Sequence, residues 1–367
     1  MLFITNKSAF LKELNLLQGV SEKKNTIPIL SNLLLETEET GITIKGTDLD
    51  LSITTFCEAE VKKTGAICVQ ARKLFEIVKS LPEAEIEIKC IEQNQVIITC
   101  EKSKFRLIGL GKENFPTINS CESFSVSLPP SLLTTFISRT LFAITNEESR
   151  YALNGAKFEI SSLGARMIAT DGHRLSFIEK PNLFFEGEKI DVLVPRKALS
   201  ELAKLCAEPC EVVEFGKDEN HLYFRLGKRL LSSRILNGQF PNYELVIPKD
   251  KRHQITFENV RLFSSIKRVA LMADEKSHSI KFDINTGFVK ISSQAAELGE
   301  SEDILSIDYD GPLIIIGFNA QYLLDFFGVI QDSEIIFEVK DSSSQAVLKP
   351  ASMNEFDYRY IVMPMRL

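Results

Sequence analysis

The chain has 367 residues, more than one hydrophobic core usually organises, and this length favours two or three domains. Its 44% hydrophobic and 25% charged residues are typical of a globular protein and exclude a disordered or low-complexity chain. The net charge of −7 excludes a protein that binds nucleic acid through an overall basic character, so any contact with DNA would need cations gathered on one surface.

The N-terminal residues have the spacing of a helix rather than that of a signal peptide. Lys7, Lys12 and Glu13 interrupt the apolar residues of positions 1–17, so the apolar centre of a signal sequence is not formed. No other stretch approaches the roughly 18 uninterrupted apolar residues that cross a bilayer. We therefore expect a soluble cytoplasmic protein that makes no membrane contact.

The first third of the chain alternates helices with strands. Residues 8–17 have one apolar face at helical spacing, and residues 67–81 predict a short apolar strand that runs directly into an amphipathic helix. Alternation with strand period follows at residues 85–89 and 96–99. This part of the chain is therefore expected to contain two helices and several strands.

The same order of elements returns twice further along the chain. Strand-to-helix segments at residues 67–81, 192–206 and 314–330 recur at steps of about 120 residues, close to a third of the chain. Opening helices are expected at residues 8–17, 131–143 and 259–273, and later strands at residues 211–215 and 334–339. Shorter landmarks keep the same order: IKGTDLD at 44–50, IATDGHR at 168–174 and, more faintly, ISSQAAE at 291–297.

These repeats define the expected architecture. We predict an α+β protein with three tandem copies of one domain, in which two helices pack on antiparallel sheets. Polar stretches near residues 119–125 and 249–254 place the domain boundaries at 1–122, 123–248 and 249–367.

Basic residues recur on the solvent faces of equivalent helices. These residues are Arg72, Lys73 and Lys79, then Arg196, Lys197 and Lys204, then Arg261, Lys267 and Arg268. If the copies surround a common axis, such faces form one cationic surface that attracts phosphates without reading bases. The alternative is that these cations only solvate helix faces. Acidic Glu76, Glu147 and Glu148 interrupt the basic runs, and residues 319–329 carry Asp325 without a cation.

One short motif has a catalytic appearance. Asp171 and His173 are two residues apart in TDGHR, as in some general-base or metal sites, and a hydrolase or nuclease using them is the enzymatic alternative. The first copy keeps only Thr47 and Asp48 at this point, and an Asp after a strand commonly caps backbone N–H groups of a turn. We therefore favour a structural or binding role and expect no catalytic residue, metal ion or cofactor.

The remaining features are the C-terminal residues and the cysteines. Residues 360–367 are apolar almost throughout, which suits either an adaptable binding surface or a terminal strand in the core. A monomeric adaptor that binds peptides through this surface, without DNA, is a further alternative.

The seven cysteines include only one close pair, Cys206 and Cys210, which predicts reduced thiols rather than a disulfide framework or a metal site.

Together the motifs resemble those of a known family. IPILSNLLLE (27–36), GTDLDL (46–51), ARKLFEIVKSLP (71–82), ATDGHRL (169–175), VPRKAL (194–199), FPNYELVIP (240–248) and VMPMRL (362–367) are similar, in this order, to the bacterial sliding clamps, the beta subunits of DNA polymerase III. The resemblance covers essentially the whole chain.

The resemblance implies a non-catalytic processivity factor. Two chains would join head to tail into a homodimeric ring of six domains, with helices lining the hole, and the ring would encircle duplex DNA irrespective of sequence. Its partners would be the replicative DNA polymerase, the clamp loader and repair proteins, which bind through short linear motifs. The protein would be cytoplasmic and associated with the nucleoid.

The resemblance also implies particular site residues. The peptide-binding cleft would comprise Leu153, Thr170, Gly172, His173, Arg174, Leu175, Pro241, Val246, Tyr322, Val362, Met363, Pro364, Met365, Arg366 and Leu367. DNA contacts would be made by Lys24, Arg72, Arg150, Tyr151, Arg196 and Lys197. The dimer interface would pair Lys73, Phe105 and Leu107 with Leu271 and Met272 of the other chain. Leu245 and Ser277 depart from the residues that the family often has at the rim of the cleft, so the flanking residues of its ligands are expected to differ.

Overall fold

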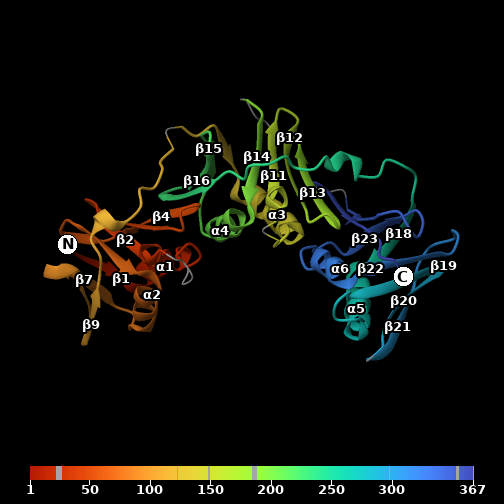
Figure 1. Ribbon diagram of the computed structural model, residues 1–367, viewed down its shortest axis with the longest axis horizontal. Helices are drawn as coiled ribbons and strands as arrows, with labels where there is room; N and C mark the ends of the chain where they lie inside the picture. Colours follow the sequence, from red (N-terminus) through yellow and green to blue (C-terminus); the bar gives the residue numbers. More distant parts are fainter. Residues whose placement is uncertain are drawn as a thin grey trace. The chain divides into compact units, whose positions relative to one another are not determined.

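The structure is a computed structural model (Figure 1). It describes residues 1–21, 27–121, 123–147, 149–183, 188–296, 298–352 and 355–366. Contacts group the chain into two compact units: Met1–Thr134 with Lys197–Ile235, and Thr135–Arg196 with Leu236–Leu367. In the described residues no helix is long and apolar enough to cross a membrane.

The elements repeat three times along the chain. The first copy contains β1 (Leu2–Asn6), α1 (Lys7–Leu16), β2 (Asn32–Thr37), β3 (Gly41–Thr47), β4 (Leu51–Glu58), β5 (Glu60–Lys63), β6 (Ala66–Gln70), α2 (Ala71–Ser80), β7 (Glu85–Ile91), β8 (Gln95–Cys100) and β9 (Ser103–Ile108). The second contains β10 (Val126–Leu128), α3 (Pro130–Thr140), β11 (Gly155–Ser161), β12 (Gly164–Thr170), β13 (Arg174–Pro181), β14 (Ile190–Pro195), α4 (Arg196–Cys206), β15 (Val213–Lys217), β16 (His221–Leu226) and β17 (Arg229–Arg234). The third contains β18 (His253–Glu258), α5 (Asn259–Val269), β19 (Ser279–Asn285), β20 (Phe288–Ala295), β21 (Gly299–Ser306), β22 (Ile314–Asn319), α6 (Ala320–Phe327), β23 (Glu334–Val339), β24 (Ala346–Pro350) and β25 (Asp357–Val362).

This order confirms the predicted fold class, three tandem α+β copies with two helices each. The opening helices end earlier than expected: α3 stops at Thr140 and continues as the 3₁₀ turn η4 (Leu141–Ala143), and α5 is followed by η7 (Ala270–Met272). The strand expected at residues 211–215 was misplaced, because β15 begins only at Val213. The periodicity of apolar residues locates an element, whereas its ends depend on local hydrogen bonds.

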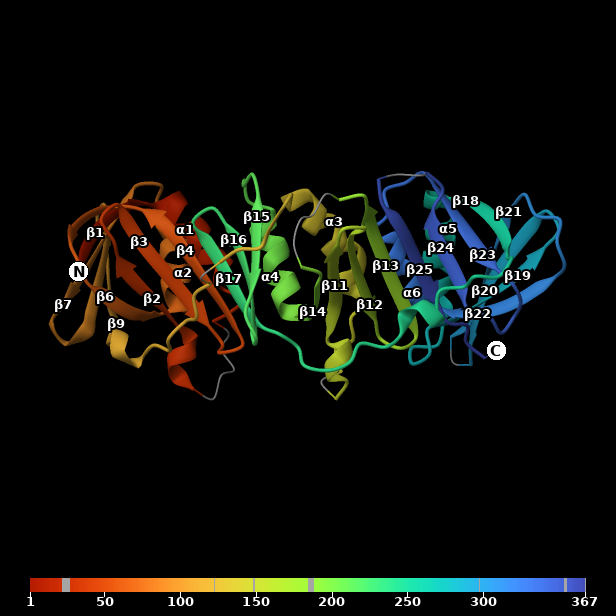
Figure 2. The ribbon, with the colours of Figure 1, turned by 90° about the horizontal axis from the view of Figure 1, so that it is seen from above.

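Each eight-stranded sheet joins two copies of the repeat. In the first unit the order is β10-β15-β16-β17-β4-β3-β2-β6, with β17 antiparallel to β4. In the second unit it is β14-β11-β12-β13-β25-β24-β23-β18, with β13 antiparallel to β25; these strands lie side by side in Figure 2. The compact units therefore cut across the sequence repeats.

Two further sheets end in edge strands with exposed side chains. The first unit contains the sheet β5-β1-β7-β8-β9, and the second contains β21-β20-β19-β22. Along both β9 and β21 half-buried residues alternate with exposed ones, and Ile108 and Ile304 are 84% and 56% exposed. A sheet edge carries unpaired backbone groups, so both strands can accept a further strand.

Candidate functional site

An apolar cavity of about 110 Å³ lies within the second compact unit. Its lining residues are Leu153, Thr170, Gly172, His173, Arg174, Leu175, Pro241, Tyr243, Val246, Ile361 and Met363. Strands β13 and β25 contribute one side, and the segment that contains the 3₁₀ turn η6 (Tyr243–Leu245) contributes another. The volume far exceeds the roughly 10–15 Å³ that holds one water molecule, so the cavity can accept a large apolar side chain.

The cavity stands on a packed apolar layer. This layer consists of Ile168, Leu175, Phe177, Leu193, Phe240, Tyr243, Val347 and Ile361, with Leu153, Leu236, Val246 and Ile247 packed against it. Tyr243 is buried between the rings of Phe177 and Phe240, at centroid distances of 6.1 and 6.4 Å. Its hydroxyl donates to Glu159 at 3.4 Å. Because close-packed interiors resist deformation, this wall is preformed rather than created by a ligand.

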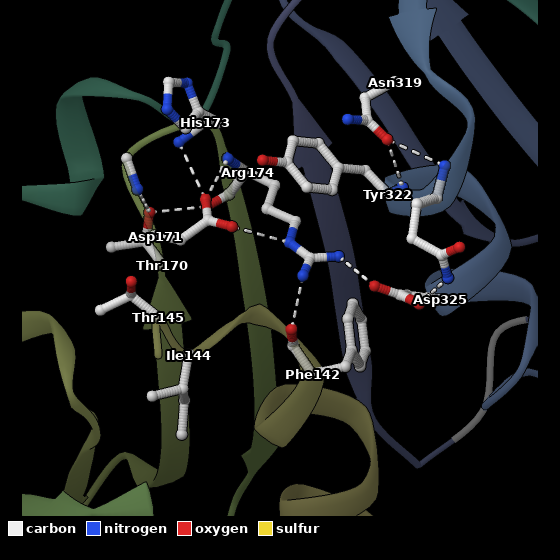
Figure 3. A network of polar contacts seen from close by, with 12 residues as sticks. Phe142, Ile144, Thr145, Thr170, Asp171, His173, Arg174, Asn319, Tyr322 and Asp325 are labelled. Carbon is white, nitrogen blue, oxygen red and sulfur yellow. Dashed lines mark hydrogen bonds and ion pairs between the residues drawn. The ribbon is translucent and has the colours of Figure 1, made fainter. Parts of the chain in front are cut away.

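The turn that follows β12 forms the polar side of the cavity. The Thr170 hydroxyl donates to the carbonyl of Arg174 at 2.6 Å and accepts the N–H of Gly172 at 3.1 Å. The Asp171 carboxylate accepts the backbone N–H groups of His173 and Arg174 at 2.9 and 3.0 Å (Figure 3). Each polar side chain thus satisfies main-chain groups of the turn, and this confirms the structural interpretation of the Thr-Asp pair.

The first copy of the repeat has the same turn. Thr47 donates to the carbonyl of Leu51 at 3.1 Å and accepts the N–H of Leu49 at 3.0 Å. Asp48 accepts the N–H groups of Asp50 and Leu51 at 3.0 and 2.7 Å. The sequence match between the two copies therefore encodes one local hydrogen-bond pattern.

Gly172 provides a testable feature of this turn. Its φ of +91° lies in the left-handed region, and a Cβ added there would come within 3.2 Å of Nη1 of Arg150. We expect Gly172→Ala to lower the free energy of unfolding by about 1–3 kcal/mol, because the backbone would be strained and crowded at once. Gly227→Ala is the control, since Gly227 also has positive φ, +59°, but open space around it. Urea unfolding of both variants measures the difference, and an equal loss would contradict the crowding argument.

Arg174 connects the turn to two other elements. Nε lies 3.0 Å from Asp171, Nη1 lies 2.6 Å from Asp325 of α6, and Nη2 donates to the carbonyl of Phe142 in η4 at 2.6 Å (Figure 3). The guanidinium also stacks 4.3 Å from the ring centroid of Tyr322. Burial opposes the charged form, but contacts with Tyr360 and the Asp325 carboxylate outweigh it, so the pKa of Arg174 is raised. Since each nitrogen of its head group contacts another group of the protein, Arg174 borders the cavity mainly as a structural element.

The C-terminal segment is a core strand in its first part and partly exposed in its second. Up to Val362 it is the buried strand β25, which pairs with β13. Beyond it, Met363 donates its N–H to the carbonyl of His173 at 2.9 Å, and Met365 donates to Gly317 at 2.8 Å. Met363 is 37% exposed and lines the cavity. After Val362 the chain therefore leaves the core, and Met363 forms part of the surface of the cavity.

The comparisons with known proteins agree along the whole chain. Models of the DNA polymerase III beta subunit match the chain as the N-terminal domain at residues 1–119, the central domain at 127–242 and the C-terminal domain at 244–366. A beta sliding clamp of Pseudomonas putida is 35% identical, with 100% of both chains covered. This chain belongs to the beta sliding clamp family.

Solved sliding clamps have the same fold. The clamp of Pseudomonas aeruginosa bound to griselimycin has a TM-score of 0.93 at 34% identity, with 100% of both chains covered. The clamp of Bacillus subtilis has a TM-score of 0.93 at 27% identity, covering 100% of this chain and 99% of the other.

Most of the cleft residues expected of a sliding clamp surround the cavity. Five that the structure describes are not among its lining residues: Tyr322, Val362, Pro364, Met365 and Arg366. Tyr322 stacks on Arg174, Val362 is buried, and Arg366 borders a separate groove with Glu300 and Glu302. Leu367 lies outside the described residues. Leu245, which was expected at the rim of the cleft, is 81% exposed.

Two lining residues were missed. Tyr243 belongs to the FPNY segment, whose paired aromatics are the signal that could have found it, and Ile361 follows the alternation of the terminal strand. Ser277 does not line the cavity. Its N–H donates to Asp274 at 2.9 Å, and its carbonyl accepts from Asn319 at 3.3 Å.

The cations expected to contact DNA already have partners within the clamp chain. Arg72 reaches Glu76 at 2.7 Å, and Lys197 reaches Asp48 at 2.7 Å. Arg150 pairs with Glu147 at 3.0 Å and donates to the carbonyl of Asp171 at 2.9 Å. Such exposed pairs are worth little individually, so a phosphate could displace them at low cost.

The remaining expected DNA contacts differ from one another. Arg196 donates to the carbonyls of Leu141 and Ile144, both at 2.8 Å, and burial lowers its pKa. This arginine therefore closes the end of η4 instead of projecting freely into solvent. Tyr151 is 72% exposed. Lys24 lies outside the described residues.

Proposed function

We propose that the chain is a DNA sliding clamp, and that two such chains close head to tail around duplex DNA. Its cleft would bind short linear motifs of the polymerase, the clamp loader and repair proteins. The activity is topological and non-catalytic. Each of the two chains would contribute three clamp domains, at residues 1–122, 123–248 and 249–367. The observation that carries this proposal is the pair of unused sheet edges, β9 and β21.

The two joints inside the chain follow one rule. The edge strand β4, from the first half of copy one, pairs with β17, from the second half of copy two. In the same way β13, from the first half of copy two, pairs with β25, from the second half of copy three. In both joints an edge strand from the first half of one copy pairs with an edge strand from the second half of the next copy. By this rule β21, in the first half of copy three, would pair with the edge strand in the second half of a first copy, which is β9. Within one chain both remain edges, so the next joint is inferred to form with a second chain.

We transfer the register of the β4–β17 joint to the free edges; the β13–β25 joint differs by one position, because the second residue of β25 pairs with the fifth residue of β13. The β4–β17 joint pairs the second residue of β17 with the fourth residue of β4. The corresponding residues are Lys104, second in β9, and Glu302, fourth in β21. Two positions along, Arg106 would oppose Glu300. Opposite charges directly across antiparallel strands stabilise the pair, and all four side chains are exposed in the single chain.

The other face of this joint is apolar. Phe105 and Leu107 are half-buried on β9, between the exposed cations. Leu271 in η7 is 76% exposed, and η7 packs beside β21, next to half-buried Met272. The joint would thus bury these residues beneath paired strands, as obligate interfaces do. Lys73, also expected here, is exposed and pairs with Glu76. The same joint formed twice closes a two-chain ring, because each chain supplies one edge of each kind.

Retention on circular DNA tests the topology. Protein loaded onto circular duplex DNA by a clamp loader is expected to stay bound in high salt, because no phosphate contact has to persist for a closed ring to remain threaded. Cutting the circle once should release it, since the ring slides off an end. Gel filtration of the complex before and after cutting measures retention. If high salt removed the protein equally from circular and linear DNA, the proposal would be contradicted. Such a loss is the result expected of a protein that binds DNA only through contacts with phosphates.

The cleft can be tested with a defined ligand. The Pseudomonas aeruginosa clamp is solved with griselimycin bound. We infer that griselimycin binds this chain in the apolar cavity, whose lining can enclose a large apolar group. Isothermal titration calorimetry with the full chain measures this binding, and absence of heat at a hundred micromolar or so would contradict the assignment of the cavity as the binding site.

A further inference from the structure

We propose that Asp325, a residue of α6 outside the cavity, is a positioning residue for the cleft: through Arg174 it holds the turn 170–175 in its binding conformation. This inference rests on the proposed function of the cleft. It also gives a purpose to the one charged residue of α6, a helix that carries no cation.

A continuous chain of contacts joins Asp325 to the cavity wall. Asp325 lies 2.6 Å from Nη1 of Arg174, and Arg174 Nε lies 3.0 Å from Asp171. Asp171 in turn accepts the N–H of His173, whose residue lines the cavity. Figure 3 shows the Arg174 guanidinium between the two carboxylates. Replacing Asp325 therefore changes the position of the Arg174 guanidinium, and Arg174 orients the Asp171 carboxylate that accepts the N–H groups of the turn.

The residues of this series of contacts are largely buried, which strengthens the ion pairs between them. The side chain of Arg174 is 9% exposed, that of Asp171 13% and that of Asp325 24%. Charged pairs shielded from water interact more strongly than surface pairs, and a buried charge that loses one partner keeps its desolvation cost. With Asp325 neutral, Arg174 retains a single carboxylate, Asp171, and a different position of the guanidinium becomes favourable.

Asp325 is itself held in place. Gln321, one turn earlier in α6, donates to its second oxygen at 2.7 Å. The N-cap of this helix is Asn319, whose side chain accepts the N–H groups of Gln321 and Tyr322 at 2.9 and 3.3 Å. Tyr322 stacks on Arg174 from the same helix. Helix α6 thus presents a carboxylate and a ring to one guanidinium. This helix belongs to the third copy, whereas the turn belongs to the second.

The test compares Asp325→Asn, Asp325→Ala and Asp325→Glu with the unmodified chain. Griselimycin affinity by calorimetry is expected to fall about tenfold in Asp325→Asn, more in Asp325→Ala, and to be largely restored in Asp325→Glu. Glu258→Gln, which removes an exposed pair with Arg261 in α5, is the control and should leave affinity unchanged. Unchanged affinity in the Asn and Ala variants, even with a lowered melting temperature, would overturn the proposal.

A double variant separates positioning from general loosening. If Asp325 acts through Arg174 and Asp171, then Asp171→Asn with Asp325→Asn should bind little worse than Asp171→Asn alone. Fully additive losses would instead mean independent effects and contradict the proposal.

Hydrogen exchange keeps the inference distinct from the proposed function. The amides of His173 and Arg174 donate to Asp171, so their exchange should accelerate in Asp325→Asn whether or not griselimycin binds. Failure of the unmodified chain to bind griselimycin would count against the cleft alone. Unchanged exchange at these two amides would count against the role of Asp325.

Discussion

We expect the chain carrying Lys104→Glu and Arg106→Glu to elute as a single protomer under conditions in which the unmodified chain elutes as a dimer. Both substitutions lie on the edge strand β9 and are exposed in the single chain, so folding should be preserved. At the proposed joint they would face Glu300 and Glu302 of β21, and attraction would become repulsion. The ring contains this joint twice, so the effect is doubled. Light scattering at micromolar concentration measures the mass.

Charge exchange makes this prediction specific. Adding Glu300→Lys and Glu302→Lys to the same chain should restore the dimer, because the pairs are re-formed with reversed signs. The matched control is Lys62→Glu with Lys63→Glu on β5, the opposite edge of the same sheet. This control should remain dimeric. Dissociation of the control, or failure of the exchanged chain to associate while it remains folded, would contradict the assigned register. Added salt should weaken the unmodified dimer through the same screened charges.

We expect Arg174→Met to lower the free energy of unfolding by about 3–5 kcal/mol, the loss typical of a buried ion pair with one partner removed. Asp171 and Asp325 would each lose their arginine, and the carbonyl of Phe142 would lose a donor. Methionine fills a similar volume, so the effect is one of charge and hydrogen bonding rather than of a cavity. Griselimycin affinity should fall together with stability, because the turn loses its orienting group. Chemical unfolding monitored by circular dichroism measures the first effect and calorimetry the second.

Arg359→Met is the matched control for this variant. Arg359 pairs with Asp357 at 2.6 Å on the strand next to β13, but its side chain is 42% exposed. Exposed pairs contribute about 0–1 kcal/mol, so this change should be nearly neutral. Comparable destabilisation by both variants would show that Arg174 is no more than an ordinary surface cation.

The local chemistry of the chain was readable from its sequence. The three copies follow from recurring apolar periodicity, and the Thr-Asp turn follows from residues whose side chains bond to nearby backbone groups. Both depend on neighbours within a few positions, which is why Thr47 and Thr170 make the same hydrogen bonds. Most of the residues that line the cavity were also named by the resemblance, and the binding of a peptide there stays a prediction.

The sequence by itself determined the repeat, the fold class and the turn. Tertiary structure alone decided which copy of the turn borders a cavity: Leu49 in the first copy is 52% exposed, while Gly172 lines an apolar pocket beside β25 and the segment of Tyr243. It also gave Asp325 its partner 151 residues away and gave each expected DNA cation in the described ranges a carboxylate or carbonyl. The physical reason is that periodicity encodes which face of an element is buried, whereas the partner across that face is set only when distant strands and helices pack together.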